Sequence, residues 1–328
     1  QLQKRRLVNT ERPQAEMLQR IASPSKRWHR WGIAASLLAI ISLSAAWMWT
    51  KQEQKERQEV AAILSPATNK GIMPGENKAI LTLTNGRQIA LGEKVGKEKP
   101  SLLDKAIAKI TGSQKQLCLD IPRGGEFKIV LEDSTVVWLN SGTQLIYPEK
   151  FAENERRVIV KGEAFFKVAH ESNRPFKVET DGQLVTVHGT QFNVKSYKED
   201  KKILTTLLEG SISLSRKGNN SEVLLSPGHQ SQFDKQTSSM NVKSVNAEMV
   251  ASWRLGKFVF ENQTLEEIMQ ELSRWYSFEY DFANADLKKI EFMGSIPRYS
   301  KFTTALTILE KSGGIRFKVH GNHLMVTK

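Results

Sequence analysis

Short runs in which apolar and polar residues alternate dominate the middle of the chain. A period of two is what a strand with one buried face requires, and turn-forming segments such as EDST, NSGT and SPGHQ separate the runs. Many short strands at regular spacing are typical of all-β folds, so residues 117–250 are predicted to form a sandwich, a jelly roll or a wound β-structure. The predicted strands are Phe127–Glu132, Thr135–Leu139, Val158–Val168, Phe176–Thr180, Leu184–His188, Gln191–Tyr197, Ile203–Leu208, Ser211–Leu214 and Glu222–Leu225.

Toward the C-terminus the apolar spacing becomes helical. One apolar stripe runs over Leu265–Tyr276, and Thr264 with Glu267 supplies a capping box at its start. A second helix is predicted at Thr303–Lys311, ended by a pair of glycines. Residues 251–328 are therefore predicted to form a small α+β domain of β-α-β-β-α-β order, with its helices covering one face of a small sheet. Its strands are expected at Phe258–Phe260, Phe278–Phe282, Phe292–Ile296 and in a closing hairpin within Ile315–Thr327.

A different pattern occupies Trp31–Trp49, which reads WGIAASLLAIISLSAAWMW and carries no charge over 19 residues. A helix of this length crosses about 30 Å of hydrocarbon. A buried soluble helix or the apolar core of a signal peptide are the alternatives, but terminal tryptophans and charge on both sides favour one transmembrane helix. The basic residues before it place residues 1–30 in the cytoplasm. Residues 50–116 are expected to form a tether and a hairpin around Asn85-Gly86.

Charge and composition exclude several classes of partner and cofactor. The chain carries a net +13, of which residues 1–30 hold +6, from eight Lys or Arg and two Glu. Basic residues beside a membrane span are explained by anionic lipid headgroups, so no direct nucleic-acid partner is predicted. The single cysteine, Cys118, excludes an intramolecular disulfide and a multi-cysteine metal site. No nucleotide or zinc motif is present, so no cofactor is predicted.

Few residues suggest catalysis by their type and spacing. His320 and His323 face each other across a tight turn and could share a metal, but such pairs more often reflect turn composition, so no metal site is predicted. Glu163 lies within a predicted strand, and pairing with Arg156 or Arg157 in a structural network is expected rather than acid–base work. No Ser/His/Asp relay can be assembled, which disfavours a conventional hydrolase.

The stretch LVTVHGTQFNVKSY, residues 184–197, has an irregularity at its centre. The apolar positions are odd before Gly189, at Val185 and Val187, and even after it, at Phe192 and Val194. One apolar face survives such a switch only if the chain bulges, kinks or turns near the glycine. The alternative is that the peptide bond after Gly189 is itself reactive.

Several motifs, in order, resemble one family. The segments IPRGGEFKIVLEDSTVVWLNSGTQLIYPEKF, RRVIVKGEAFFKVAHESNRPFKVET, VTVHGTQFNVKSY, TTLLEGSISL, LSPGHQ and WRLGKFVFENQTLEEIMQELSRWYSFEY are similar to the FecR family of anti-sigma regulators, in the form common in the Bacteroidota. The resemblance covers roughly Ile80–Lys328. No single motif would suffice, and their succession makes the resemblance specific.

The resemblance implies a signalling role across the cell envelope. A cytoplasmic tail would hold an ECF-type sigma factor, and one helix would cross the inner membrane. The C-terminal bulk would lie in the periplasm and sense the signalling domain of a TonB-dependent, SusC-like outer-membrane transporter, to control uptake of glycans or iron chelates. Periplasmic and intramembrane proteases are implied partners. The family's cytoplasmic region is usually longer and this chain begins without Met, so the tail at residues 1–30 is expected to be truncated.

The resemblance also implies particular residues. Some family members cleave themselves at a Gly-Thr bond in the motif that here reads VHGTQF, while others keep this motif as structure. In the cleaving form, the Thr190 hydroxyl would attack the Gly189 carbonyl and His188 would assist proton transfer.

The C-terminal domain resembles the short N-terminal domain of secretins and TonB receptors and is implied to dock the transporter through apolar groups or a strand edge. Its candidate docking residues, which could equally complete the core, are Phe258, Phe260, Trp275, Tyr276, Phe317, Val319 and Met325.

Two other classes of function remain open. A membrane-anchored periplasmic protein that binds carbohydrate or envelope components would show aromatic side chains clustered in a concave groove. An autoproteolytic enzyme without a regulatory partner is the third possibility. An anti-sigma factor that is not an enzyme in the ordinary sense, apart from self-cleavage, is the leading hypothesis.

Overall fold

The computed structural model describes residues 43–44, 46–61, 71–92, 116–216 and 222–328. The chain divides into two compact units, Gln1–Lys55 and Glu56–Lys328. Residues 43–44 and 46–61 are helical, whereas most of the expected transmembrane segment, residues 31–42 and 45, lies outside the described residues. Within the described residues, no helix has the length and apolar character needed to cross a membrane.

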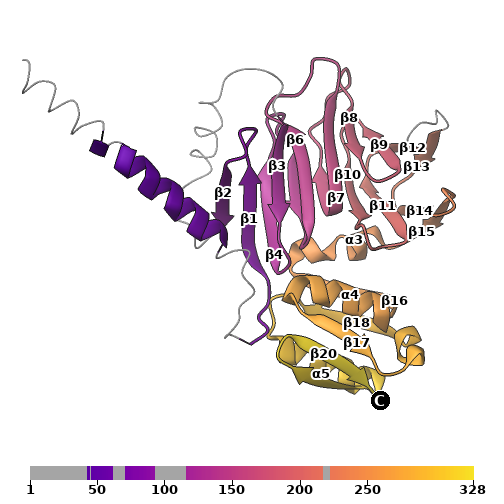
Figure 1. Ribbon diagram of the computed structural model, residues 1–328. Helices are drawn as coiled ribbons and strands as arrows, with labels where there is room; N and C mark the ends of the chain where they lie inside the picture. The colour runs from indigo at the N-terminus through magenta and orange to yellow at the C-terminus, as the bar shows by residue number, and fades with distance from the viewer. Residues whose placement is uncertain (1–42, 45, 62–70, 93–115, 217–221) are drawn as a thin grey trace, which may run out of the picture. The chain divides into compact units, whose positions relative to one another are not determined.

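Six strands of the second unit close into a small barrel-like ring (Figure 1). Their order is β7-β5-β4-β1-β3-β6, and β6 pairs back to β7. The ring is antiparallel except where β1 meets β4. The predicted hairpin at Asn85-Gly86 is confirmed, because β2 (Gln88–Gly92) returns antiparallel along β1. The ring strands are β1 (Glu76–Thr82), β3 (Gln116–Ile121), β4 (Gly125–Val130), β5 (Val136–Leu139), β6 (Thr143–Pro148) and β7 (Arg156–Lys167).

Two flaps of sheet extend from the ring and cover one core. The first flap contains β8 (Phe176–Glu179), β9 (Gln183–Val187), β12 (Ile212–Arg216) and β13 (Glu222–Leu225). The second contains β10 (Gln191–Ser196), β11 (Lys202–Glu209), β14 (His229–Asp234) and β15 (Met240–Ser244). Both flaps start from β7, which pairs with β8 through its first half and with β10 through its second. Phe166 of β7 packs on Phe176 of the first flap, with ring centroids 6.0 Å apart, and on Phe192 of the second, at 5.1 Å.

The prediction of a mainly β fold is confirmed, and the nine predicted strands are all present with small shifts at their ends. Strands β3, β6, β14 and β15 were not among them. In β14 the buried residues include Gln230 and Ser231, which are polar, so the sequence lacks the apolar alternation that would indicate a strand. Strand β15 has no buried residue and therefore shows no apolar alternation.

The C-terminal module, defined here as residues 257–328, contains two small sheets rather than the single sheet predicted. One sheet pairs β16 (Lys257–Thr264) with β18 (Glu291–Pro297), and the other has the order β17-β20-β19. The chain passes between the sheets three times, through helix α4 (Leu265–Tyr276), through a 3₁₀ turn, η2 (Ala285–Lys289), and through helix α5 (Phe302–Gly313). The second sheet contains β17 (Glu279–Phe282), β19 (Arg316–His320) and β20 (His323–Thr327).

Both predicted helices of the module are present. Helix α4 (Leu265–Tyr276) begins with the expected capping box, in which Thr264 and Glu267 satisfy each other's backbone groups. Helix α5 (Phe302–Gly313) ends at Gly314, whose φ of 61° is left-handed. The module has its own apolar core, formed by one face of each helix and both sheets. A short helix, α3 (Ala247–Val250), and a 3₁₀ turn, η1 (Ser252–Leu255), connect it to β15.

The turning point of β7 yields a stability prediction. Gly162 has a φ of 117°, and a Cβ at this position would lie 2.7 Å from Thr143 Cα on β6. We expect Gly162→Ala to lower the free energy of unfolding by about 3 kcal/mol, because neither backbone can move without breaking the ring. Gly86→Ala is the control, since its φ of 79° is equally unusual but nothing lies within 4 Å. It should cost about 1 kcal/mol, and equal losses in urea denaturation would contradict this explanation.

Candidate functional site

Gly189 lies where the chain crosses from one flap to the other. Strand β9 pairs with β8 and β12, whereas β10 pairs with β7 and β11. Val185 and Val187 before the glycine and Phe192 and Val194 after it all enter the same core. The change from odd to even apolar positions is therefore a turn between strands that lie on opposite sides of this core.

Glycine is required at residue 189 by close packing. A Cβ there would lie 2.5 Å from His170 Nδ1 and 2.9 Å from His170 Cα. The backbone φ is not in the left-handed region, so a positive φ is not the reason for the glycine. His170, which the sequence did not single out, is the histidine that packs on this turn. Its position follows from the pairing of β7 with β10, which no local pattern reveals.

The Thr190 side chain is buried and held by one hydrogen bond. Its hydroxyl donates to the Ser211 carbonyl oxygen at 3.0 Å, and its own carbonyl accepts from Val168 N–H at 3.0 Å. Thr190 directly follows Gly189 in the chain, which is the arrangement that an N-to-O acyl shift onto its hydroxyl oxygen requires. The exposed ring of His188 instead lies 3.4 Å from the Glu171 carbonyl oxygen, and no hydrogen bond joins it to Thr190 in the described part of the chain.

The outward face of β10 forms a second candidate site, which the sequence analysis missed. Asn193 accepts a hydrogen bond from Trp253 Nε1 at 3.1 Å and donates to Glu163 at 3.0 Å. Asn140 Nδ2 donates to the other carboxylate oxygen of Glu163 at 2.8 Å. Two amide side chains thus satisfy a buried carboxylate, and Trp253 joins them to the connection that precedes the C-terminal module.

The expected pairing of Glu163 with Arg156 or Arg157 is wrong. Arg156 is fully buried and binds Asp133 at 2.8 Å. Arg157 binds Glu155 at 2.7 Å and Glu179 at 3.2 Å. Arg156 and Arg157 lie seven and six residues before Glu163, about 20 Å along an extended strand, so neither side chain reaches its carboxylate.

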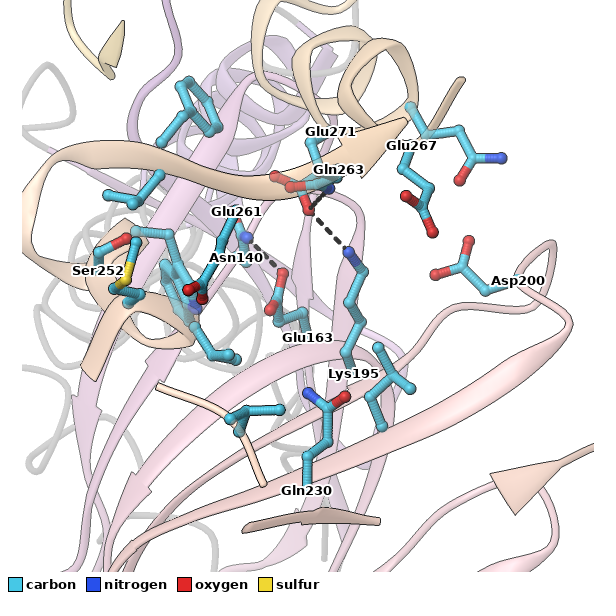
Figure 2. A pocket seen from close by; sticks show the side chains of 18 of the residues that line it. Asn140, Glu163, Lys195, Asp200, Gln230, Ser252, Glu261, Gln263, Glu267 and Glu271 are labelled. Atoms are coloured by element: carbon cyan, nitrogen blue, oxygen red, sulfur yellow. Dashed lines mark hydrogen bonds and ion pairs between the residues drawn. The ribbon is translucent and has the colours of Figure 1, made fainter. Parts of the chain in front are cut away.

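Lys195 and Glu271 join β10 to helix α4 (Figure 2). Lys195 Nζ lies 2.9 Å from Glu271 Oε1, and Gln263 donates to the same oxygen at 3.0 Å. Burial alone would raise the pKa of Glu271, but the Lys195 charge and the two hydrogen bonds outweigh it, so the pKa lies below its usual value. Burial likewise opposes the charge of Lys195, yet Glu271 and Glu163 raise its pKa. Both groups are therefore charged near neutral pH.

Arg274 continues the same line of contacts. Its guanidinium lies 3.8 Å from the ring of Tyr197, and its Nη1 is 2.9 Å from Glu199 and 3.5 Å from Asp200. Burial opposes the charged form, but the surrounding negative groups prevail and raise the pKa of Arg274. The guanidinium is thus a permanent charge held between the module and the loop after β10.

Arg298 packs among aromatic rings on the other side of the interface. It is fully buried, lies 3.8 Å from the Trp275 ring, donates to Asn140 and has Glu126 at 3.3 Å. Burial lowers the pKa of Arg298, although an arginine so close to a carboxylate keeps its charge. Asn140 thus contacts both Arg298 of the C-terminal module and Glu163 of β7, and so links the Arg298 contacts to those around Glu163.

The predicted docking residues fall into two groups. Phe258, Phe260, Trp275 and Tyr276 are buried in the core of the C-terminal module, in agreement with the alternative that they complete it. The other three lie in the closing hairpin, where Val319 is 48% exposed and Phe317 and Met325 are partly buried.

A polar cleft separates the outward face of the second flap from β16 and α4 (Figure 2). Its volume is about 640 Å³. The aromatic residues that line it, Trp253, Phe258 and Tyr197, are buried, so the described lining offers no open aromatic platform. Among the described residues no group of three or more His, Cys, Asp or Glu could hold a metal ion. His323, considered as a ligand from the sequence, contacts Asp281 at 3.0 Å.

The partly buried ion pair yields a pH prediction. We expect Glu271→Gln to lower the free energy of unfolding at pH 7 by about 2 kcal/mol, because it leaves a partly buried ammonium without its nearest counter-charge. Since the folded-state pKa of Glu271 is depressed, the parent's advantage is fully present above pH 4.5 and is lost as the pH falls through the lowered pKa.

The matched control is Glu266→Gln on the same helix. Glu266 and its partner Lys288 are each more than 40% exposed, so we expect the free energy of unfolding to fall by less than about 1 kcal/mol. Urea denaturation from pH 3 to pH 8 measures both effects. The assignment of a stabilising Lys195–Glu271 ion pair would be contradicted if Glu271→Gln lost no more unfolding free energy than the control. A loss that stayed the same in acid would also contradict it.

Comparison with known proteins identifies the family. One family model, FecR protein, matches residues 119–213, and another, FecR, C-terminal, matches residues 257–326. Two crystal structures of a "putative anti-sigma factor" from Parabacteroides distasonis ATCC 8503, at 1.65 Å and 2.50 Å resolution, are each 27% identical with a TM-score of 0.60. They cover 64% and 65% of this chain, and 98% and 99% of the solved chains. No curated protein matches the sequence. The resemblance seen in the sequence is confirmed, and the chain belongs to the FecR family of anti-sigma factors.

Proposed function

We propose that this anti-sigma factor is a single-pass inner-membrane protein that relays a signal from outside the cytoplasm to an ECF-type sigma factor. The observation that carries the proposal is the succession of the two FecR family models along one chain. The uncharged Trp31–Trp49 segment and the basic residues before it support a cytoplasmic N-terminus and a periplasmic C-terminal bulk. The signal source is the signalling domain of a TonB-dependent, SusC-like outer-membrane transporter, and periplasmic and intramembrane proteases release the sigma factor.

The docking element in this proposal is the edge strand β19. Within the described residues it pairs only with β20, which leaves its other edge available for strand addition. Val319 is the exposed apolar residue on this strand. The buried aromatic residues Phe258 and Trp275 belong to the core of the module and do not contact a partner directly.

Self-cleavage is the second part of the proposal. The Thr190 hydroxyl attacks the Gly189 carbonyl carbon, the Gly189–Thr190 C–N bond breaks, and an ester with a free Thr190 amine forms. Water then opens the ester, which gives a Gly189 carboxylate and restores the Thr190 hydroxyl. The hydrogen bond from Thr190 to Ser211 supports this step, because the hydroxyl uses its hydrogen in this bond and keeps its oxygen lone pairs for the attack. His170, which packs on Gly189, is a second candidate base beside His188.

Transporter docking is tested by Val319→Asp. A charge on the pairing edge should weaken binding of the full chain to the transporter's signalling domain about tenfold, measured by calorimetry. Val242→Asp on β15 is the control, because Val242 is similarly exposed but lies on an edge outside the C-terminal module. Equal affinities for both variants would reject β19 as the docking strand, and no binding by the parent would reject the transporter as the partner.

Self-cleavage is tested by the intact mass of the purified chain. The parent should give two fragments, residues 1–189 and 190–328, whereas Thr190→Ala should give one full-length mass. Thr190→Ser keeps the hydroxyl and should still cleave, and separate His170→Ala and His188→Ala variants show which imidazole assists. One full-length mass in the parent would end the self-cleavage proposal and leave the anti-sigma assignment intact.

A further inference from the structure

Residues from Trp253 onward contact the β-domain at several places, and one row of these contacts lies along β10. Alternate residues of β10 and its extension form this row: Asn193 meets Trp253, Lys195 meets Glu271, and Tyr197 meets Arg274. Residues two apart on a strand point to the same side, so one polar face of β10 carries all three contacts. Arg274 extends the row to Glu199 and Asp200 in the following loop.

The opposite face of the same strand is fixed in the β-core. Phe192 and Val194 are fully buried, and Phe192 stacks on Phe166 of β7. The backbone of β10 pairs with β7 from Gln191 opposite Lys167 to Ser196 opposite Gly162. Strand β10 is therefore one element through which a movement of the C-terminal module would reach the core.

The N-terminal end of β10 lies directly at the Gly189 turn. The hydrogen bond from Val168 N–H to the Thr190 carbonyl continues the β7–β10 ladder by one residue beyond Gln191. The bond that fixes Thr190 is thus part of the ladder that a loosening of β10 against β7 would weaken. No loop or flexible segment separates the polar row from this turn, because β10 starts at Gln191.

The interface is of a kind that can separate. Ion pairs, amides and a cation over a ring form the row on β10, and the polar cleft lies beside it. Nη2 of Arg274 is buried without a hydrogen-bond partner in the described part of the chain. Buried charges contribute little net stability, because their attraction repays the lost hydration only in part. Each part also has its own apolar core, and only a smaller cluster, in which Ala251 and Trp253 pack with Phe165, joins the connection to the β-domain.

We propose that β10 is a coupling strand, through which attachment of the C-terminal module protects the Gly189–Thr190 turn and detachment loosens it. The module rests on the polar face of β10 as a removable partner within the chain. The proposal deepens the proposed function, in which a transporter domain pulls on or displaces the module. The coupling itself is a property of this chain alone, so it can be measured without a sigma factor, a transporter or a cleavage event.

Hydrogen–deuterium exchange of the full chain in mild detergent tests the coupling. In Glu271→Gln, amides in the peptide covering residues 188–197 should exchange on the order of tenfold faster than in the parent, because one charge-assisted contact of the row is lost. Glu266→Gln should leave this peptide unchanged, since its partner Lys288 lies within the C-terminal module. To prevent cleavage from affecting the result, every variant also carries Thr190→Ala.

A second, milder variant guards against unfolding. Trp253→Phe keeps the ring and removes only the N–H that Asn193 accepts, so exchange at residues 188–197 should rise about threefold. Fast exchange throughout the Glu271→Gln variant would mean that it unfolds, and the Trp253→Phe variant then provides the test of the coupling. Faster exchange confined to residues 257–328, with residues 188–197 at the parent rate, would overturn the proposal. Its failure would leave the anti-sigma assignment standing, because that assignment is tested by partner binding.

Discussion

Strand β7 has to serve both flaps of the β-domain at once, and the placement of the other elements follows from this constraint. Its first half pairs with β6 and β8, and its second half with β5 and β10. The change of partners occurs at Gly162, whose left-handed φ and contact with Thr143 leave no room for a side chain. Because the strands of the two flaps follow each other in pairs along the chain, the chain crosses between the flaps after β9, after β11 and after β13, and Gly189 lies at the first of these crossings.

The same turning point creates the polar surface outside the second flap. Glu163 comes directly after Gly162 and faces outward, where Asn140 and Asn193 satisfy it. A carboxylate in this position cannot be covered by an apolar surface without a large desolvation cost, so only a partner with matching donors can pack there. Trp253 and Arg298 are such donors, because they donate to Asn193 and Asn140, the two amides that satisfy Glu163. The polar contacts therefore determine where the module sits, while the two apolar cores supply most of the stability.

Local sequence patterns predicted the elements well, and long-range pairing limited the prediction of the site. The nine strands, the capping box at Thr264 and the turn at Gly189 depend on neighbours a few residues apart, and they could be read directly. The partners of Glu163 and the position of His170 depend on strand register, which a single sequence does not encode locally. The aromatic docking candidates in the module were ambiguous for a related reason. Core and interface both favour aromatic residues, and only the fold shows that Trp275 is inside.

The central claim, that the protein controls a sigma factor, is tested most directly by transcript levels in cells. RNA sequencing would compare the parent strain, a strain lacking this gene, and a strain lacking both this gene and the ECF-type sigma factor gene. The account predicts that deletion changes one coherent set of genes sharing a promoter motif, and that the change disappears when the sigma factor is also absent. An unchanged transcriptome, or a change that persists in the absence of every ECF-type sigma factor, would contradict it.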